Sequence, residues 1–200
     1  MKDNSKIIVL FVEGDTEAEF YSLLIKHYRS ISKKSFPEVK IFNLKGIGRF
    51  ESKVTSKLKN DILKDKKYKD LEVKVFCCYD TDVFELAKKP PTNWKKVKKD
   101  VADIGIKSFY EIKSERMIED WFIKDLEGVC DFLGIKPPKK KNSNGLEFLK
   151  ELFKSCKKPK IYQKGSYTHK FLEKISIAKI IQSLKGVFDK LEEELNIDKV

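Results

Sequence analysis

Short apolar runs alternate with longer amphipathic segments over the first two thirds of the chain. Four runs rich in β-branched and aromatic residues predict strands, at residues 6–12, 39–44, 71–79 and 107–112. Apolar residues at helical spacing predict helices over residues 16–29, 50–66, 93–104 and 115–126. Because strands that alternate with helices form βαβ units, the pattern predicts an α/β, Rossmann-like fold with a mainly parallel sheet flanked by helices.

The pattern changes after residue 134. The segment PPKKKNSNG is a polar connector, and only helical spacing follows it, over residues 146–156, 169–175 and 177–195, the last two as separate helices or as one. We therefore expect an α/β core at residues 1–134 and a C-terminal helical addition at residues 135–200, packed on that core.

The charge balance adds a candidate partner. Lys and Arg number 43 against 31 Asp and Glu, which gives a net charge of +12 and favours nucleic acid over a neutral ligand, although a solvated Lys-rich surface is the alternative. The sequence shows neither a signal peptide nor a membrane-length apolar run, so we expect a soluble, cytoplasmic protein that binds no membrane. The four cysteines lack metal-binding spacing and are expected to be reduced thiols in the core, with Cys77 and Cys78 facing opposite sides of a strand.

Acidic residues follow two of the predicted strands. Glu13 comes directly after the first strand, and Asp80 and Asp82 come at the end of the third. The carboxyl ends of parallel strands share one edge of a sheet, so we expect these carboxylates to converge there. Carboxylates in one cleft repel each other unless a divalent cation neutralises them, and hard oxygen ligands without His or Cys favour Mg²⁺ or Mn²⁺.

Some of these polar residues also suit purely structural roles. Asp15 or Thr16 is a candidate N-cap of the first helix, and Thr16 with Glu19 fits a capping box. Asp80 and Asp82 also suit a turn. Capping does not account for Glu13, which precedes the cap at the end of the strand.

A third acidic element lies in the segment SERMIEDWF. Glu115 and Glu119 are four residues apart, so one helix would place both beside its apolar face. There they would either border a cleft and hold a second ion or form a solvated helix edge.

The pairing of VEG at residues 12–14 with DTD at residues 80–82 resembles the Toprim domain, the metal-binding α/β module of topoisomerases, primases and OLD-family nucleases. VEGDTEAEFY and IEDWF are most similar to the small stand-alone and OLD-like Toprim nucleases of bacterial defence systems. The resemblance covers residues 6 to about 126, with a Lys-bearing segment near the C-terminus as a further match.

The resemblance implies roles for individual residues. Glu13 would be a metal ligand or general acid/base, and Asp80 and Asp82 would be metal ligands. Glu17 and Glu119 match acidic positions that hold a second metal in the nuclease branch.

The basic candidates come from two segments. In IYQKGSYTHKF, Lys164 is the first match to a late basic residue that contacts phosphate or the transition state, Lys170 is the second, and Tyr162 is a candidate for base stacking. In LKGIGRF, Lys45 and Arg49 flank glycines and are candidates for binding a phosphate, although the segment also fits a simple turn.

The function that the resemblance implies is a Mg²⁺- or Mn²⁺-dependent endonuclease acting on DNA or RNA, with a two-metal site. This function is compatible with a role as effector of an anti-phage defence system that includes an ATPase partner. It is also compatible with a homo-oligomer. Two alternatives stay open. One is a non-catalytic, nucleic-acid-binding or regulatory Toprim subunit. The other is a haloacid-dehalogenase-like phosphatase with Asp80 as nucleophile and Asp82 as acid/base.

Overall fold

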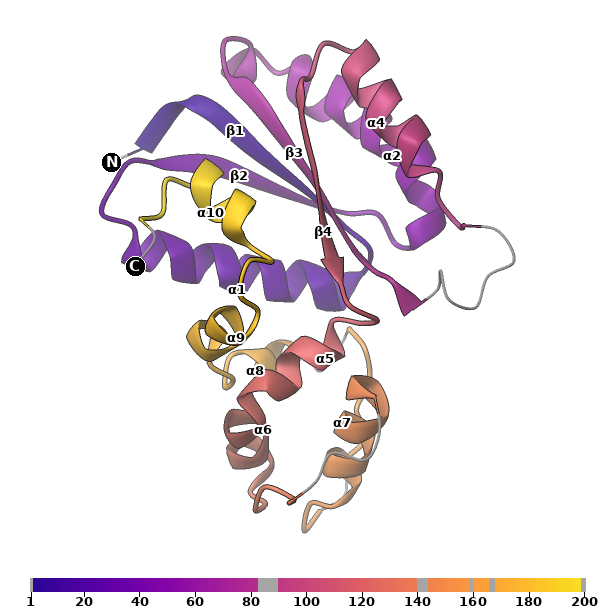
Figure 1. The fold of residues 1–200 in the computed structure, drawn as a ribbon, viewed down its shortest axis with the longest axis vertical. Helices are drawn as coiled ribbons and strands as arrows, with labels where there is room; N and C mark the ends of the chain where they lie inside the picture. Colours follow the sequence, from indigo (N-terminus) through magenta and orange to yellow (C-terminus); the bar gives the residue numbers. More distant parts are fainter. Residues whose placement is uncertain (1, 83–89, 140–143, 159, 166–167, 199–200) are drawn as a thin grey trace.

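A four-stranded parallel sheet forms the centre of the protein (Figure 1). The computed structural model describes residues 2–82, 90–139, 144–158, 160–165 and 168–198. The strand order is β2-β1-β3-β4, and the strands are β1 (Lys2–Val12), β2 (Phe36–Asn43), β3 (Glu72–Asp80) and β4 (Ser108–Ser114). Strands β1 and β3 are neighbours, with Val12 opposite Cys78. The predicted α/β class and the four predicted strands are confirmed.

Helices cover both faces of this sheet. Helix α1 (Asp15–Ile31) packs on one face, and α2 (Phe50–Lys57) with α4 (Trp94–Asp103) pack on the other. Alternate residues of β1 enter different apolar clusters, because successive side chains of a strand point to opposite faces. Cys77 and Cys78 follow the same rule, and all four cysteines are buried and unbridged, as predicted.

The C-terminal helices extend the apolar cluster on the α1 face. Figure 1 shows α5 to α8 gathered beyond α1, on the side of the sheet away from α2 and α4. Phe171, Phe188 and Leu191 are buried in the same cluster as residues of α1 and β1, so a single core connects the two regions. The helices are α5 (Glu119–Phe122), α6 (Leu126–Leu133), α7 (Gly145–Lys154), α8 (Thr168–Leu172), α9 (Ile177–Ser183) and α10 (Asp189–Glu194). The predicted helical addition is confirmed, whereas a domain boundary at residue 134 stays a prediction.

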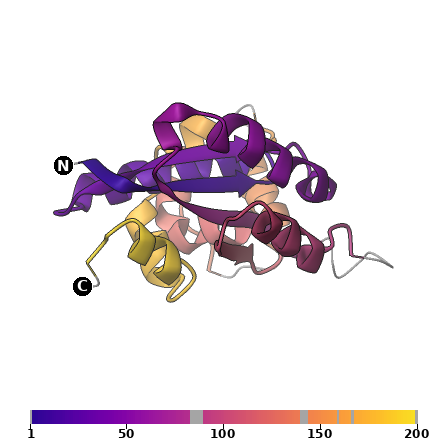
Figure 2. The same cartoon turned by 90° about the horizontal axis from the view of Figure 1, so that it is seen from above.

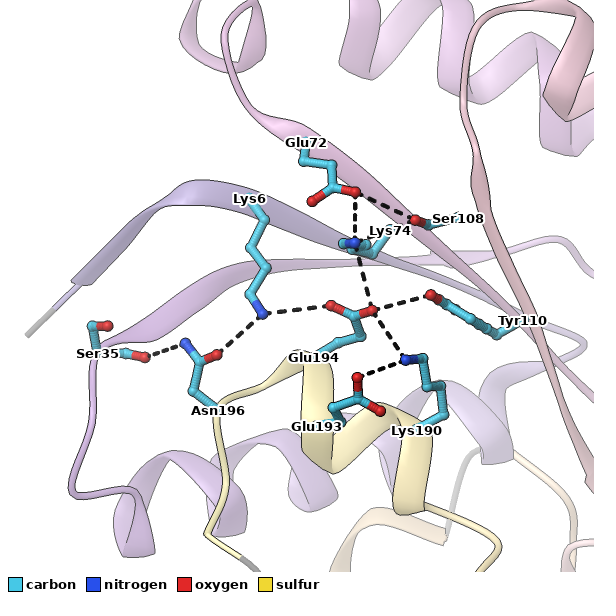
Figure 3. Close-up of polar contacts among 10 residues, drawn as sticks. All are labelled: Lys6, Ser35, Glu72, Lys74, Ser108, Tyr110, Lys190, Glu193, Glu194 and Asn196. Atoms are coloured by element: carbon cyan, nitrogen blue, oxygen red, sulfur yellow. Dashed lines mark hydrogen bonds and ion pairs between the residues drawn. The ribbon is translucent and has the colours of Figure 1, made fainter.

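A buried carboxylate fixes α10 against the amino ends of the strands. Glu194 is 6% exposed, and its carboxylate lies 3.4 Å from the Lys6 ammonium and 3.6 Å from that of Lys74, while the Tyr110 hydroxyl donates to it at 3.1 Å (Figure 3). These partners come from β1, β3 and β4. The network explains why the start of β1 and helix α10 lie on the same side of the molecule in both ribbon views (Figures 1 and 2).

Two predicted helices are divided in the structure. The segment 50–66 is α-helical to Lys57 and then forms a π-helix, Leu58–Leu63. Residues 177–195 form two helices, α9 and α10, separated by a turn in which Gly186 has φ of 84°. Glycine adopts such a positive φ without the steric cost that a β-carbon would bring.

The prediction of one helix over residues 115–126 is wrong. Residues after β4 form a turn in which Arg116 has φ of 69°, and α5 begins only at Glu119. The turn is held to the end of β3, because the Thr81 hydroxyl accepts the Arg116 N–H at 2.8 Å and the Arg116 carbonyl accepts the N–H groups of Thr81 and Asp82 at 2.9 Å. Glu115 therefore does not share a helix side with Glu119. Within the described ranges, no helix is both long and apolar enough to cross a lipid bilayer.

Candidate active site

Two acidic side chains meet at the carboxyl end of the sheet because their strands are neighbours. Glu13 directly follows β1, Asp80 ends β3, and the Asp80 N–H donates to the Glu13 carboxylate. Both acids line a pocket of about 350 Å³ between the strand ends and the start of α1. The other lining residues are Gly14, Asp15, Thr16, Glu17, Lys45, Gly46, Lys164 and Gly165. The structure thus brings together Glu13, Glu17, Asp80, Lys45 and Lys164 of the predicted site residues.

Glu17 enters the pocket from the first turn of α1. Its carboxylate folds back over Gly14, so that a β-carbon on Gly14 would lie 2.8 Å from Glu17 Oε2. Burial raises the pKa of Glu17, although the N–H groups of Glu17 and Gly14 at the helix start oppose the shift. Gly14 has an extended backbone, with φ of −147°, so the side chain of Glu17 rather than backbone strain selects glycine here.

The predicted capping box and the predicted cap by Asp15 or Thr16 are wrong. Gly14 is the N-cap residue of α1, and no side chain caps it. The Asp15 carboxylate instead pairs with the Lys45 ammonium and accepts from the Asn43 amide at 2.7 Å. The Thr16 hydroxyl accepts the Gly165 N–H at 3.1 Å. Asp15 and Thr16, which the local pattern assigned to capping, therefore bind residues that are distant in the sequence.

Lys164 supplies a basic group at this pocket. Its ammonium nitrogen lies 3.2 Å from Glu119 Oε2 and 4.0 Å from Asp80 Oδ2, and its side chain is about half exposed. Glu119 itself is fully buried at the start of α5. Burial lowers the pKa of Lys164, but the charges of Glu119 and Asp80 outweigh it and raise the pKa overall.

Tyr162 is a further partner of this ion pair that the sequence did not reveal. Its hydroxyl donates to Glu119 Oε1 at 3.2 Å, and its ring packs against Phe153 and Phe171 at 5.3 and 6.3 Å between ring centroids. With 5% exposure, the ring is in the core, so the predicted base-stacking role of Tyr162 is wrong. In the sequence, only its position two residues before Lys164 indicated that Tyr162 lies near the site.

Burial and mutual repulsion alter the ionisation of the two central acids. Burial, followed by the charge of Glu17, raises the pKa of Glu13 to about 7. Burial and then the charge of Glu17 raise the pKa of Asp80 to about 8, although Lys164 opposes the shift. Both carboxyl groups therefore exchange protons near neutral pH, as groups at functional sites commonly do.

Asp82 lies outside the pocket lining, although sequence spacing predicts that it faces the same ion as Asp80. Asp82 follows a bend at Thr81, beyond the extended part of β3, so strand geometry does not keep the two acids on one side. The charge of Asp82 nevertheless contributes to the raised pKa of Glu13.

The remaining basic candidates contribute little free charge to the pocket. Arg49, at the end of a 3₁₀ helix, and Lys170, in α8, are exposed and absent from the pocket lining. Lys45 does line the pocket, but its ammonium is paired with Asp15. Among the predicted basic residues, Lys164 is therefore the one that contacts the central acids.

The carboxylate oxygens of the pocket suit a hard divalent cation. Within the described part of the chain, the buried atoms Glu13 Oε2 and Asp80 Oδ1 have no hydrogen-bond donor. Unpaired carboxylate oxygens of this kind are ligands for Mg²⁺ or Mn²⁺. No group of three or more acidic, His or Cys side chains among the described residues is already arranged around a common metal position. Lys164 lies within ion-pair distance of two of the acids, Asp80 and Glu119.

Comparison with known proteins finds a distant structural similarity. No protein-family profile and no curated protein sequence matches this chain. Among solved structures, the chain is similar to the C-terminal region of the Xanthomonas campestris pv. campestris OLD protein, with 14% sequence identity and a TM-score of 0.34. The match covers 94% of this chain and 96% of that one. A similarity at this level does not establish a shared family.

Proposed function

We propose that this protein is a divalent-cation-dependent nuclease that hydrolyses phosphodiester bonds of DNA or RNA. The observation that carries the proposal is the juxtaposition of Glu13 and Asp80, two acids with donor-free buried oxygens, on neighbouring strand ends of one pocket. The Toprim-like motifs of the sequence support the same function, and they extend it to a defence effector that works with an ATPase partner.

The residues of the pocket divide into cation-binding and substrate-binding groups. Glu13 and Asp80 would hold a Mg²⁺ or Mn²⁺ ion, with Glu17, Glu119 and Asp82 as further ligands. Such an ion would neutralise the acids and lower the pKa of a bound water. Glu13 would position that water or accept its proton. Lys164 would contact a phosphate oxygen, since its side chain is about half exposed at the same pocket.

The overall charge suits the proposed substrate. A protein with a net charge of +12 attracts the phosphate backbone at long range. The attraction weakens with salt, because the release of condensed counterions from nucleic acid becomes less favourable as the salt concentration rises. We therefore expect binding to fall steeply between about 50 and 200 mM salt.

The phosphatase alternative is less compatible with the site. A nucleophilic aspartate must be accessible to the phosphorus atom of a substrate, but Asp80 is only 5% exposed. Glu13 also has no role in that mechanism.

Cleavage assays with single- and double-stranded DNA and RNA test the proposal. The purified protein is incubated with each substrate, with EDTA, Mg²⁺ or Mn²⁺. We expect metal-dependent cleavage that falls at least about 100-fold in Glu13→Gln, which removes a group that acts in proton transfer, and in Asp80→Asn, which removes a ligand of the ion. Glu115→Gln is the matched control, because Glu115 is an exposed acid outside the pocket. Nucleic-acid binding without cleavage under any of these conditions would contradict the proposal and support a regulatory subunit.

A further inference from the structure

One ammonium group is shared by two buried acids of the candidate site. Lys164 Nζ lies 3.2 Å from Glu119 and 4.0 Å from Asp80, whose residues are 0% and 5% exposed. The two acids come from α5 and from the end of β3, so no local pairing rule brings them together. The lysine side chain is 46% exposed and reaches them from the solvent side.

The backbone around Lys164 is also held by contacts that do not involve its ammonium. Two residues earlier, the Tyr162 ring is buried among aromatic rings of the core. One residue later, the Gly165 N–H donates to the Thr16 hydroxyl at 3.1 Å, in a backbone with φ of 91°. The Lys164 side chain can therefore leave the acids by rotating about its own bonds, while its backbone stays at the pocket.

We propose that Lys164 is an internal counter-cation that holds Asp80 and Glu119 in the metal-free protein and is displaced when a divalent cation binds them. This inference rests on the proposed function, since it requires that the acids bind an ion. It goes further by making ion binding and release of the lysine one coupled event.

The charges at the pocket provide the driving force for the exchange. Glu13 and Glu17 add two more carboxyl groups, and a single ammonium does not neutralise four acids. A divalent cation carries twice the charge of an ammonium and binds carboxylate oxygens directly. Once displaced, Lys164 is free to bind a phosphate group, so the metal-loaded site alone presents it to substrate.

Lysine reactivity tests the displacement directly. The wild-type protein is labelled with a limiting amount of an acetylating reagent, with and without Mn²⁺, and each lysine is quantified by mass spectrometry. We expect Lys164 to react at least about threefold faster with Mn²⁺, because an ion-paired ammonium is protected from deprotonation and attack. Exposed Lys33 is the internal control and should not change.

Mn²⁺ affinity provides the second measurement. Isothermal titration calorimetry compares the wild type with Lys164→Met and with the control Lys174→Met, which removes an exposed lysine outside the pocket. We expect Lys164→Met to bind Mn²⁺ about three- to tenfold more tightly, as for removal of a competing, partly solvated charge. Lys174→Met should bind like the wild type, and circular dichroism checks that both variants fold.

The outcomes separate this inference from the proposed function. Mn²⁺ binding with unchanged Lys164 reactivity would overturn the displacement, and the proposed metal site would then stand. Tighter Mn²⁺ binding by Lys164→Met would not rescue the displacement, because removal of a positive charge raises the affinity even if the lysine of the wild type does not move. Failure of every protein to bind Mn²⁺ would overturn both.

Discussion

The ammonium nitrogen of Lys164 lies 3.2 Å from the carboxylate of Glu119, and this contact joins the C-terminal part of the chain to the carboxyl end of the sheet. Tyr162 holds the second oxygen of the same carboxylate at 3.2 Å. The candidate site is therefore built from both parts of the protein, and the C-terminal segment contributes chemistry as well as packing.

The raised pKa of Asp80 predicts a pH-dependent cost to stability. The pKa is about 8 in the folded protein against about 3.9 in an unfolded chain, so the folded state binds the proton more tightly. The contribution of Asp80 to stability is therefore present below about pH 4 and lost as pH rises through about 8. We expect Asp80→Asn to stabilise the metal-free protein at pH 8 by roughly 1–3 kcal/mol, relative to its effect at pH 5.

Urea denaturation at both pH values measures this difference. Asp61→Asn is the control, because Asp61 forms a surface ion pair with Lys57 and should change stability by less than about 0.5 kcal/mol at either pH. An Asp80→Asn protein that is less stable than the wild type at pH 8 would show that the Asp80 carboxylate is stabilised, rather than strained, by its surroundings.

Gly14→Ala should displace Glu17 without unfolding the protein. The new β-carbon would lie 2.8 Å from Glu17 Oε2, so the carboxylate must move out of its position over the helix start. We expect a loss of stability of about 1 kcal/mol or less, because Ala is a poorer N-cap than Gly, together with at least about a tenfold loss of cleavage.

Gly48→Ala is the matched control for this change. Among the described residues, a β-carbon there would meet only the Pro91 carbonyl, at 3.9 Å, and Gly48 has no positive φ. Equal cleavage by the wild type and Gly14→Ala would remove Glu17 from the catalytic proposal.

Thr16→Val should loosen the segment that carries Lys164. The substitution keeps the shape of a residue that is 2% exposed, but it removes the oxygen that accepts the Gly165 N–H. Loss of one such hydrogen bond costs about 1 kcal/mol, which corresponds to about fivefold faster hydrogen exchange at the Gly165 amide if the segment opens locally. Thr16→Ser retains the hydroxyl and should protect that amide as the wild type does. Unchanged exchange in Thr16→Val would show that further contacts hold the segment.

Glu194→Gln should destabilise the docking of α10. The change leaves the ammonium groups of Lys6 and Lys74, whose side chains are 13% and 12% exposed, without their shared carboxylate. Removal of one partner of a buried ion pair costs about 3 kcal/mol or more when the other charge is left unpaired. Because Lys74 retains Glu72 at 2.6 Å and Lys6 retains Asn196 at 3.1 Å, we expect a loss of roughly 1–3 kcal/mol. Glu193→Gln is the neighbouring control, since its side chain is 64% exposed and its pair with Lys190 contributes less than about 1 kcal/mol. Thermal unfolding measures the melting temperature of both variants. An equal decrease in Glu194→Gln and Glu193→Gln would contradict a special role for Glu194.

The sequence by itself determined the α/β class, the approximate strands and the location of Glu13 and Asp80 at strand ends. These features follow from local periodicity, because the spacing of apolar residues within a segment marks the face that the strand or helix buries. The strand order was not available from spacing, and it is the adjacency of β1 and β3 that brings the two acids together.

Only the tertiary structure decided the details that depend on distant partners. Thr81 holds Arg116 in a left-handed turn that no local preference predicts, so the expected helix does not form over residues 115–118. Likewise, Thr16 binds Gly165 rather than its own helix, and Lys164 contacts Glu119 in a structure whose C-terminal helices share one core with α1. Such contacts join segments far apart in the chain, and their geometry is fixed by packing of the whole core rather than by any one segment.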